Sequence, residues 1–240
     1  MNKLQNKTIL VTGGTGSFGS AFVSQILNPK YKVKKIIIFS RDELKQFQLK
    51  NKLNDKKNII RFFLGDVRDR ERLNFALKNV DIVVHAAALK QVPAAEYNPI
   101  EFVKTNVIGS QNLIEASINA KVNKVIALST DKAVSPLNLY GATKLCSDKL
   151  FVAANNITGK QNTIFSIVRY GNVLGSRGSI LDEFIKQDKL KQKFKITDLK
   201  MTRFNILMKD AIELVIWGIN NLTGGEIVIP KLKDLCNQTS

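Results

Sequence analysis

The 240-residue sequence has few of the residues that cross-link or interrupt a chain: two cysteines, five prolines and a single histidine. Cys146 and Cys236 lie far apart, so their spacing excludes a disulfide framework and a cysteine-rich metal site, and it fits a reducing cytoplasm. No apolar run reaches the length of a membrane span, and the N-terminal residues lack the apolar segment of a signal peptide. We therefore expect a cytoplasmic protein with no metal site and no membrane contact. The helical pattern around Cys146 predicts that its thiol is packed.

Negative charge is also scarce, because 37 lysines and arginines outnumber 20 aspartates and glutamates and leave a formal net charge of +17. Nucleic-acid-binding proteins carry such an excess. Here the basic residues are spread over segments such as Lys30–Lys35 and Lys186–Lys195, without the interleaved aromatic residues of a single-strand binding surface. We therefore expect no nucleic-acid partner. The charge indicates solvated lysine-rich faces or attraction of an anionic substrate, and it does not distinguish the two.

Apolar, strand-like runs alternate along the chain with amphipathic, helix-like stretches. The strand-like runs are Thr8–Val11, Lys35–Phe39, Ile59–Leu64, Asp81–His85, Lys124–Leu128 and Phe165–Arg169; the helix-like stretches are Ser17–Leu27, Arg41–Leu53, Asp69–Lys78, Pro99–Asn119 and Leu139–Asn155. This alternation predicts the α/β class with a doubly wound parallel sheet, a Rossmann domain, in which ligands bind beyond the carboxyl ends of the strands.

The pattern loosens after Arg169. The remaining segments are Tyr170–Gly178, which predicts a loop, Lys186–Lys200, which is basic and irregular, Asp210–Gly218, which is helix-like, and Glu226–Ile229, which is strand-like. We expect residues 1–172 to form the Rossmann domain and residues 173–240 to form a small, incomplete C-terminal lobe that completes the ligand site. The helix and strand at about 210–229 are expected to pack back on the core.

The first strand-like run leads into Thr12–Gly19, which reads TGGTGSFG. Glycines spaced in this way between a strand and a helix are typical of a dinucleotide-binding βαβ unit. The backbone can approach a pyrophosphate, the last glycine lets the helix pack on the strand, and N–H groups at the helix start face the phosphates. The motif alone is a moderate signal. It is strengthened by Tyr140–Lys144 (YGATK), which lies downstream of a strand end at Ser129 and Thr130.

The residues after the second strand-like run bear on which dinucleotide binds. An acidic residue commonly bonds the ribose 2′-hydroxyl of NAD there, but this chain reads Ser40, Arg41, Asp42. A guanidinium suits the 2′-phosphate of NADP, so NADP is favoured. In the NAD alternative Asp42 faces the ribose and Arg41 points into solvent. Asp66, which precedes Val67, is expected to accept a hydrogen bond from the adenine amino group. Alternatively, Asp66 caps the helix that follows.

Tyr140 and Lys144 lie four residues apart and share one face of a helix. An ammonium ~4 Å away, at an effective dielectric constant of about 20, contributes roughly 4 kcal/mol, which would lower the pKa of a tyrosine from ~10 to near neutrality and make it a usable base. Thr130 is placed to hydrogen-bond the substrate hydroxyl from which Tyr140 would take a proton. Asp131 and Lys132 follow at that strand end. If burial leaves Lys132 neutral, this adjacent acid and base imply a further step beyond hydride transfer to the dinucleotide: the base removes a C–H proton and the acid helps to expel a hydroxyl group. An ordinary ion pair is the alternative.

These segments together resemble the extended short-chain dehydrogenase/reductases and, more narrowly, the inverting UDP-N-acetylglucosamine 4,6-dehydratases that open pseudaminic acid biosynthesis. The matching segments are Thr12–Gly19, Ser40–Gln46 (SRDELKQ), Gly65–Arg68 (GDVR), His85–Lys90 (HAAALK), Ala95–Pro99 (AEYNP), Leu128–Lys149 (LSTDKAVSPLNLYGATKLCSDK), Arg169–Gly178 (RYGNVLGSRG) and Met201–Phe204 (MTRF). The pair Asp131–Lys132 is the most specific match, because retaining 4,6-dehydratases of this superfamily carry Asp-Glu there.

The resemblance implies a cycle in which Tyr140, helped by Thr130 and Lys144, takes the C4 hydroxyl proton while hydride passes to NADP⁺. Lys132 then removes the C5 proton, and Asp131 donates a proton to the departing C6 hydroxyl. Hydride returns to C6, and C5 is reprotonated from the opposite face. The implied product is UDP-2-acetamido-2,6-dideoxy-β-L-arabino-hexos-4-ulose, made from UDP-N-acetylglucosamine with loss of water. The implied setting is polysaccharide biosynthesis and flagellin glycosylation, with the enzyme a homo-oligomer.

Matching the family's motifs assigns roles to individual residues. The expected catalytic residues are Thr130, Asp131, Lys132, Tyr140 and Lys144. The expected cofactor-binding residues are Gly13, Thr15, Gly16, Ser17, Phe18, Gly19, Ser40, Arg41, Asp66, Val67, Ala86, Ala87, Ala88, Lys90, Asn106, Tyr140 and Lys144. The expected substrate-binding residues are Lys90, Asn172, Arg177 and Arg203. Asn106 matches the asparagine that holds the active-site helix, so a scaffold role is as well supported as a catalytic one.

The chain departs from the family in two places. Gln91 stands where histidine is common, and the chain stops where relatives continue for several dozen residues that complete the substrate lobe. The alternatives are therefore a UDP-sugar 4-epimerase, which needs Tyr140 and Lys144 but no elimination pair, and a shortened, catalytically weak NADP-binding remnant.

Overall fold

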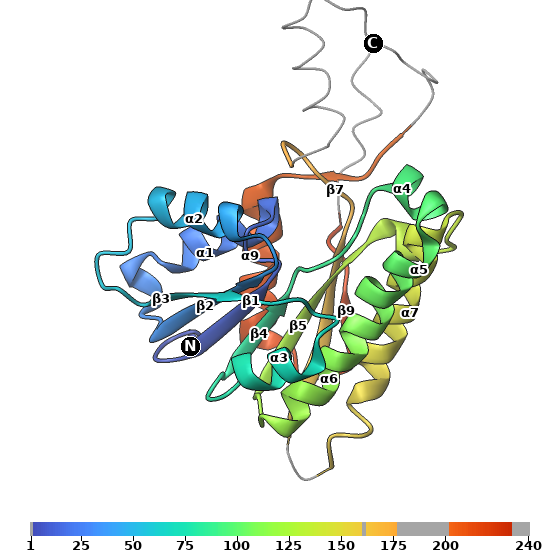
Figure 1. The fold of residues 1–240 in the computed structure, drawn as a ribbon. Coiled ribbons are helices and arrows are strands. Elements are labelled where there is room, and N and C mark those ends of the chain that lie inside the picture. Colours follow the sequence, from blue (N-terminus) through green and yellow to red (C-terminus); the bar gives the residue numbers. More distant parts are fainter. Residues whose placement is uncertain (1, 160–161, 177–201, 232–240) are drawn as a thin grey trace, which may run out of the picture.

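The structure is a computed structural model that describes residues 2–159, 162–176 and 202–231. Its centre is a seven-stranded sheet with the strand order β3-β2-β1-β4-β5-β6-β9 (Figure 1). The strands are β1 (Thr8–Thr12), β2 (Lys35–Ser40), β3 (Ile60–Leu64), β4 (Ile82–His85), β5 (Lys124–Thr130), β6 (Ile164–Tyr170) and β9 (Ile227–Val228). Each neighbouring pair runs parallel. The predicted doubly wound parallel sheet is therefore confirmed.

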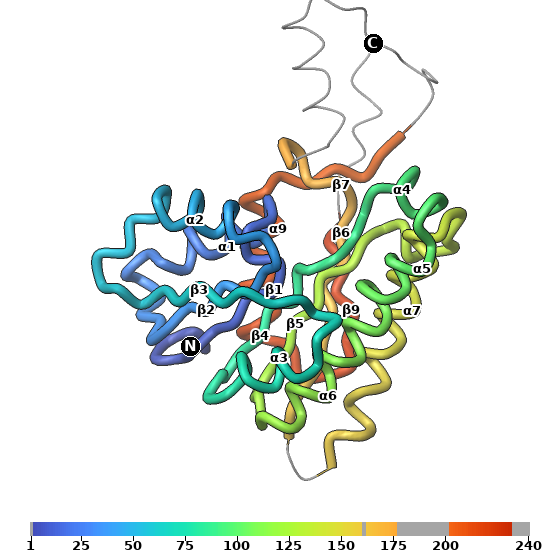
Figure 2. The backbone as a smooth tube through the Cα atoms, viewed as in Figure 1, coloured from blue at the N-terminus to red at the C-terminus, as the bar shows by residue number. Residues whose placement is uncertain are grey.

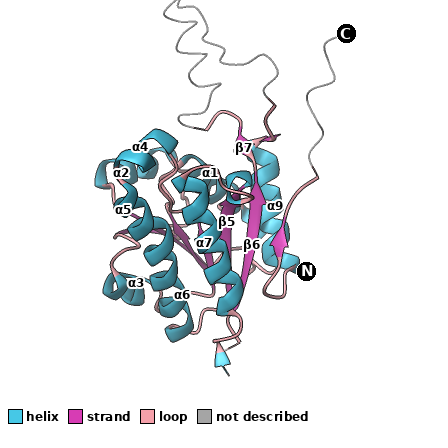
Figure 3. Cartoon of the chain, turned by 90° about the vertical axis from the view of Figure 1, so that its right-hand side faces the viewer, coloured by secondary structure: helices cyan, strands magenta, loops and turns pink. Residues whose placement is uncertain are grey.

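Helices cover both faces of the sheet. They are α1 (Ser17–Ile26), α2 (Glu43–Lys52), α3 (Arg70–Ala76), α4 (Val92–Tyr97), α5 (Pro99–Phe102), α6 (Gly109–Asn119), α7 (Leu139–Ala154) and α9 (Met208–Asn221). Short turns of other helical types are η1 (Pro29–Tyr31), η2 (Val103–Ile108, a π-helix) and η3 (Asp131–Ala133). Figure 3 shows α3, α6 and α7 on one side of the sheet and α9 on the other, and α1 packs against α9. No described helix has both the length and the apolar character that a membrane crossing requires.

The core consists of two apolar layers, one on each face of the sheet. Side chains alternate along β1, so that Ile9 and Val11 join the layer under α1 and α9, whereas Leu10 joins the layer under α3, α6 and α7. Each layer buries whole aromatic side chains, such as Phe22 in the first and Phe151 in the second. Near-continuous apolar strands are what a parallel sheet covered on both faces requires.

The last described helix belongs to this core. On α9 the residues Ala211, Val215 and Ile219 recur every four positions and are fully buried. They pack α9 against α1, although the two helices lie at opposite ends of the chain (Figure 2). Lys124 at the start of β5 donates two 2.7 Å hydrogen bonds from its Nζ to the Ile219 and Leu222 carbonyls, which lie at the C-terminal end of α9.

Two expectations about helical segments differ from the structure. The helix expected over Pro99–Asn119 is divided into α5, the π-helix η2 and α6, and α4 precedes it. An apolar pattern of period 3.6 does not reveal a local i→i+5 turn, so no pattern in the residues predicts η2. The prediction that the Cys146 thiol is packed is wrong, because Cys146 lies on an exposed part of α7.

The segment Tyr170–Gly178, expected to be a loop, contains β7 (Asn172–Val173), which pairs in parallel with β8 (Asn205–Ile206). Two residues are too few to produce an alternating pattern, so this pairing leaves no trace in the sequence. It draws the chain just before α9 across the end of β6. The basic stretch Lys186–Lys200 lies outside the described residues.

Candidate active site

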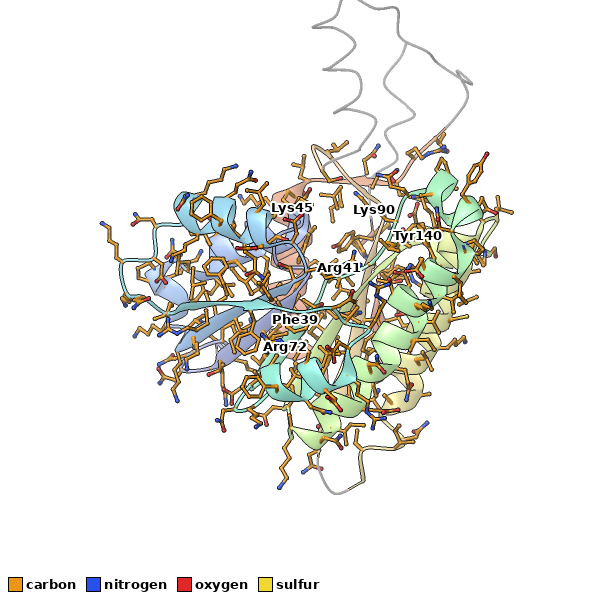
Figure 4. The ribbon with its side chains drawn as sticks, in the orientation of Figure 1. Phe39, Arg41, Lys45, Arg72, Lys90 and Tyr140 are labelled. Carbon is orange, nitrogen blue, oxygen red and sulfur yellow. The ribbon has the colours of Figure 1, made fainter. Side chains whose placement is uncertain are left out.

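The candidate site lies beyond the carboxyl ends of the strands, where the sheet changes direction. Strand order reverses between β1 and β4, and ligands of doubly wound sheets bind at that position. Because all seven strands run parallel, the segments that follow β1 to β5 meet at one edge of the sheet. Figure 4 shows Arg41, Lys45, Lys90 and Tyr140 at this edge.

The turn between β1 and α1 is shaped for close approach of backbone. Gly13 has φ +64°, and a Cβ there would lie 2.8 Å from the Ala87 backbone after β4. A Cβ at Gly19 would lie 2.5 Å from the Gly13 carbonyl oxygen, so only a hydrogen fits where α1 packs on the turn. Gly16, the N-cap of α1, provides no side-chain cap for the first N–H groups of the helix. This geometry leaves the helix start suited to phosphate oxygens.

A buried polar chain joins the glycine turn to the segment after β4. The Thr12 hydroxyl lies 2.8 Å from His85 Nδ1, and the Ala87 N–H donates to the same hydroxyl at 3.3 Å. Burial, and then the positive charge of Lys144, lowers the pKa of His85 to about 3, so its ring is neutral. Neutral His85 braces the cofactor-side turn and carries no charge into the site.

Asn106 ties three elements together from within the π-helix η2. Its amide accepts from the Leu89 N–H at 2.9 Å, donates to the Leu89 carbonyl at 2.9 Å, and donates to Thr143 Oγ1 at 3.0 Å. Asn106 is buried. Its side chain therefore fixes the segment Ala86–Lys90 against the first turns of α7.

The end of β2 carries the residues expected near the ribose. Asp42 is the N-cap of α2: it accepts from the Lys45 N–H at 2.9 Å and pairs with Lys45 Nζ at 2.7 Å. Arg41 reaches Asp66 Oδ2 at 3.4 Å, with half of its side chain exposed. The carboxylate of Asp42 is thus engaged in a helix cap, while Arg41 lies between the ends of β2 and β3.

Asp66 is held in place mainly by Arg68. Its carboxylate accepts from the Arg68 N–H, Nε and Nη2 at 2.9, 2.9 and 2.7 Å. Burial acts to raise the pKa of Asp66, but the hydrogen bonds from Arg68 and the charge of Arg41 leave it lowered overall. The cap of α3 is Asp69, which accepts from the Arg72 N–H, so the capping alternative for Asp66 does not apply.

Gln46, in the SRDELKQ segment, has a structural role that the sequence analysis did not identify. Gln46 is buried, and its Nε2 donates to the Ser40 carbonyl, the Ser40 hydroxyl and the Phe63 carbonyl at 3.0–3.1 Å. It fastens the ends of β2 and β3 beneath Arg41. A polar residue on the buried side of an otherwise exposed helix was the available signal, and Ser40 is consequently also buried.

Tyr140 and Lys144 share one face of α7, but their electrostatics differ from the expectation. Burial is the main cause that raises the pKa of Tyr140 to about 12. The carboxylates of Asp131 and Asp148 also raise this pKa, and a hydrogen bond with Thr130 lowers it. The Lys144 ammonium donates to the Leu128 carbonyl at 2.8 Å, and burial lowers the pKa of Lys144. The prediction that Lys144 brings the pKa of Tyr140 near neutrality is therefore wrong for this state of the site, because burial and the carboxylates raise that pKa and the opposing group is Thr130.

The adjacent acid and base lie beside that tyrosine. Asp131 Oδ1 accepts from the Thr130 hydroxyl at 2.9 Å and from Lys132 Nζ at 3.1 Å. Lys132 Nζ also donates to Asn172 Oδ1 at 3.0 Å. The side chains of Lys132 and Asp131 are 33% and 26% exposed, so both can reach a ligand. Partial burial, and then the positive charge of Lys132, lowers the pKa of Lys90.

The remaining expected residues lie around this centre or outside the described chain. Phe18 stacks on Tyr170 with ring centroids 6.2 Å apart, and Tyr170 in turn interacts with Tyr140. The Asn172 N–H donates to the Phe204 carbonyl at 2.7 Å, so the pairing of β7 with β8 brings Arg203, which is exposed, to the same end of the sheet. Arg177 lies outside the described residues.

Comparisons with known proteins agree with this architecture. A family model described as "Polysaccharide biosynthesis protein" matches residues 9–237. A Campylobacter jejuni protein named "UDP-N-acetylglucosamine 4,6-dehydratase (inverting)" is 55% identical over 230 residues, which are 95% of this chain and 68% of the relative. A Rickettsia prowazekii protein named "UDP-glucose 4-epimerase" is 44% identical over 94% of this chain and 66% of its own length.

Two solved structures have the same fold. Pen from Bacillus thuringiensis superposes with a TM-score of 0.92 at 43% identity, covering 97% of this chain and 71% of that one. DesIV from Streptomyces venezuelae, a dTDP-glucose 4,6-dehydratase solved with NAD and TYD bound, superposes with a TM-score of 0.83 at 24% identity, covering 92% of this chain and 74% of that one. At that identity the second likeness supports the fold alone.

Proposed function

The chain belongs to the family of polysaccharide biosynthesis proteins, and from that premise we propose that it is an inverting UDP-N-acetylglucosamine 4,6-dehydratase. The reaction oxidises the sugar at C4, eliminates water across C5 and C6, and reduces C6 with inversion at C5. The observation that carries the proposal is the contact chain at the end of β5. Thr130, Asp131 and Lys132 are joined by hydrogen bonds of 2.9 and 3.1 Å, and Tyr140 bonds Thr130.

Each member of this chain has a proposed task. Tyr140 takes the C4 hydroxyl proton, with Thr130 bonded to the same hydroxyl. Lys132 Nζ takes the proton from C5, which becomes acidic once C4 is a ketone, and Asp131 gives a proton to the leaving C6 hydroxyl. The existing contact of 3.1 Å between Lys132 and Asp131 lets the acid and the base exchange a proton between turnovers. Asn172, at 3.0 Å from Lys132 Nζ, holds that amine toward the sugar.

A nicotinamide dinucleotide fits the glycine turn, because only glycine fits where the turn packs on Ala87 and on the start of α1, and no side chain caps the first N–H groups of that helix. When bound, it would accept a hydride from C4 and return it to C6. This chain's residues bind and orient it: the start of α1 faces the pyrophosphate, and Ala86–Lys90, fastened by Asn106, lines the opposite wall. Lys144 donates a hydrogen bond to the Leu128 carbonyl, and this contact fixes α7 against β5 near Tyr140.

We propose NADP as that dinucleotide. Arg41 and Lys45 place two positive charges at the end of β2, where the 2′-phosphate would lie (Figure 4). The carboxylate expected to bond the 2′-hydroxyl of NAD would be Asp42, and it is engaged as the cap of α2 and as the partner of Lys45. An Arg–phosphate contact adds a charge-assisted, geometrically specific bond.

The remaining parts of the proposal concern the setting of the enzyme. We propose that it acts in the cytoplasm as a homo-oligomer on a pathway to pseudaminic acid and flagellin glycosylation. Lys90, Asn172, Arg177 and Arg203 are the proposed contacts to UDP-N-acetylglucosamine. Lys90 and Arg203 supply positive charge suited to the diphosphate of that substrate.

A UDP-sugar 4-epimerase is the second candidate, favoured by the Rickettsia relative, which is 44% identical to this chain. An epimerase uses Tyr140 and Lys144 but has no use for an elimination pair beside them. Product analysis separates the two. Purified protein with NADP⁺ and UDP-N-acetylglucosamine should give a 6-deoxy-4-keto sugar nucleotide, and Tyr140→Phe should give none. Formation of only UDP-N-acetylgalactosamine would replace the dehydratase proposal with the epimerase one.

A further inference from the structure

Three consecutive residues at the end of β5 each contact a different turn of α7. The Leu128 carbonyl accepts from Lys144 Nζ at 2.8 Å, the Ser129 hydroxyl donates to Asp148 Oδ2 at 2.6 Å, and Thr130 bonds Tyr140. Tyr140, Lys144 and Asp148 are spaced four residues apart, so they lie on one face of the helix. This strand–helix connection holds the proposed base and its lysine, and Asp148 is the member with no role in the reaction as described.

Asp148 also reaches the next strand. Arg169 Nη2 on β6 donates to Asp148 Oδ2 at 2.7 Å, and β5–β6 register places Arg169 directly beside Ser129. The side chain of Asp148 is 3% exposed and that of Arg169 is 12% exposed. An ionised carboxylate so deeply buried is retained only where it is paired and hydrogen-bonded, and both conditions are met here.

The surroundings of Lys144 contain few charges. The groups that interact with it are Asp148, one turn further along α7, and His85 from β4, and Arg169 from β6 is bound to the Asp148 carboxylate. Tyr170 of β6 and Asp131 of η3 face the Tyr140 end. His85 and Tyr170 are neutral, since burial lowers the pKa of the first and raises that of the second. Asp148 is the group that opposes the lowering of the Lys144 pKa by burial.

We propose that Asp148 is a positioning residue for the dehydratase reaction: its carboxylate fastens α7 to β5 and β6 and supplies the buried negative charge that keeps Lys144 an ammonium one turn from Tyr140. This inference rests on the proposed function for its catalytic consequence. Its electrostatic part, the effect of Asp148 on the protonation of Lys144, does not depend on that function. Without the carboxylate, the buried Arg169 would be uncompensated, and Lys144 would lose its proton at lower pH because only burial would then act on it.

The test measures the protonation of Lys144 directly. Protein labelled with ¹³C at lysine Cε is titrated by NMR in the presence of NADP⁺, and the Lys144 resonance is identified by its absence in Lys144→Met. Wild type is compared with Asp148→Asn, with the conservative Asp148→Glu, and with Arg169→Met. Arg169→Met breaks the same link to β6 but keeps the negative charge. If Asp148→Asn fails to fold, the double variant Asp148→Asn/Arg169→Met removes the orphaned guanidinium and is titrated instead.

The expected result is that the Lys144 midpoint moves to lower pH in Asp148→Asn, or in the double variant, and stays near or above the wild-type value in Arg169→Met and Asp148→Glu. With UDP-N-acetylglucosamine, kcat of Asp148→Asn should fall by roughly tenfold with little change in KM, and Asp148→Glu should recover part of it. An unchanged midpoint in the charge-removed variant, or an equal downward shift in Arg169→Met, would overturn the inference. A wild type that titrates as expected but leaves the sugar nucleotide unchanged would refute the proposed function alone.

Discussion

Asn106→Ala is predicted to loosen the wall of the cofactor site and to lower the free energy of unfolding. The substitution removes three hydrogen bonds of 2.9–3.0 Å, two to the Leu89 backbone and one to Thr143 Oγ1. At a net ~1 kcal/mol for each bond, the loss is about 3 kcal/mol. Leu89 is half-buried, so water can reach the backbone groups left behind, and we add no further penalty for them. A loss of this size lowers Tm by roughly 6–12 °C in a chain of this length.

Urea unfolding gives the free energy, and isothermal titration with NADP⁺ gives the affinity. The control is Asn119→Ala, the same chemical change at an exposed residue of α6. Asn106→Ala should be less stable than the control by about 3 kcal/mol and should bind the cofactor more weakly, because Ala86–Lys90 is no longer fastened. A stability difference under about 1 kcal/mol, together with unchanged cofactor affinity, would refute the reasoning that Asn106 holds this wall.

Three further predictions follow from the site and the core. Arg41→Ala should weaken NADP⁺ binding more than NAD⁺ binding, whereas Lys50→Ala, in the last turn of the following helix α2, should change neither; equal losses for both dinucleotides would remove the 2′-phosphate argument. Lys132→Glu should lose the C5-inverted product, and an unaltered rate and stereochemistry would rule out Lys132 as the C5 base. Burial acts to raise the pKa of Glu226, but hydrogen bonds, mainly from Thr223, lower it from 4.5 to about 2. The stability that Glu226 contributes, about 1–2 kcal/mol after screening, is complete above pH 4.5 and lost as the pH falls through 2. Glu226→Gln should therefore unfold more easily than wild type at pH 6 and equally at pH 2; a gap independent of pH would contradict this.

The sequence was sufficient for the features that depend on regular patterns. The alternation of strands and helices predicted the doubly wound sheet, and parallel strands necessarily bring their carboxyl ends to one edge. For that reason the sequence predicts that Arg41, Asp66 and Lys90, which follow three different strands, lie at one edge of the sheet. The glycine turn was equally accessible, because the backbone approach between Gly13 and Ala87 is a steric requirement that only glycine meets.

The features that were missed depend on contacts between distant segments. The pairing of Asp148 with Arg169 joins a helix to a strand, and nothing in the local pattern of either residue distinguishes it from a surface charge. The hydrogen-bond partners of Gln46 and the π-helix around Asn106 likewise follow from packing rather than from periodicity. Residue spacing shows that Lys144 lies one turn from Tyr140, but it does not show how deeply the phenol is buried, and burial is the largest cause of the raised pKa of Tyr140.

The measurement that tests the central claim most directly is the fate of the C5 hydrogen. UDP-N-acetylglucosamine is incubated with the protein and NADP⁺ in deuterated water, and the sugar nucleotide is followed by NMR. The account predicts a 6-deoxy-4-keto product that carries deuterium at C5 with inverted configuration, because Lys132 removes the C5 proton and C5 is reprotonated from the opposite face. A product with hydrogen retained at C5, or with unchanged configuration there, would contradict it.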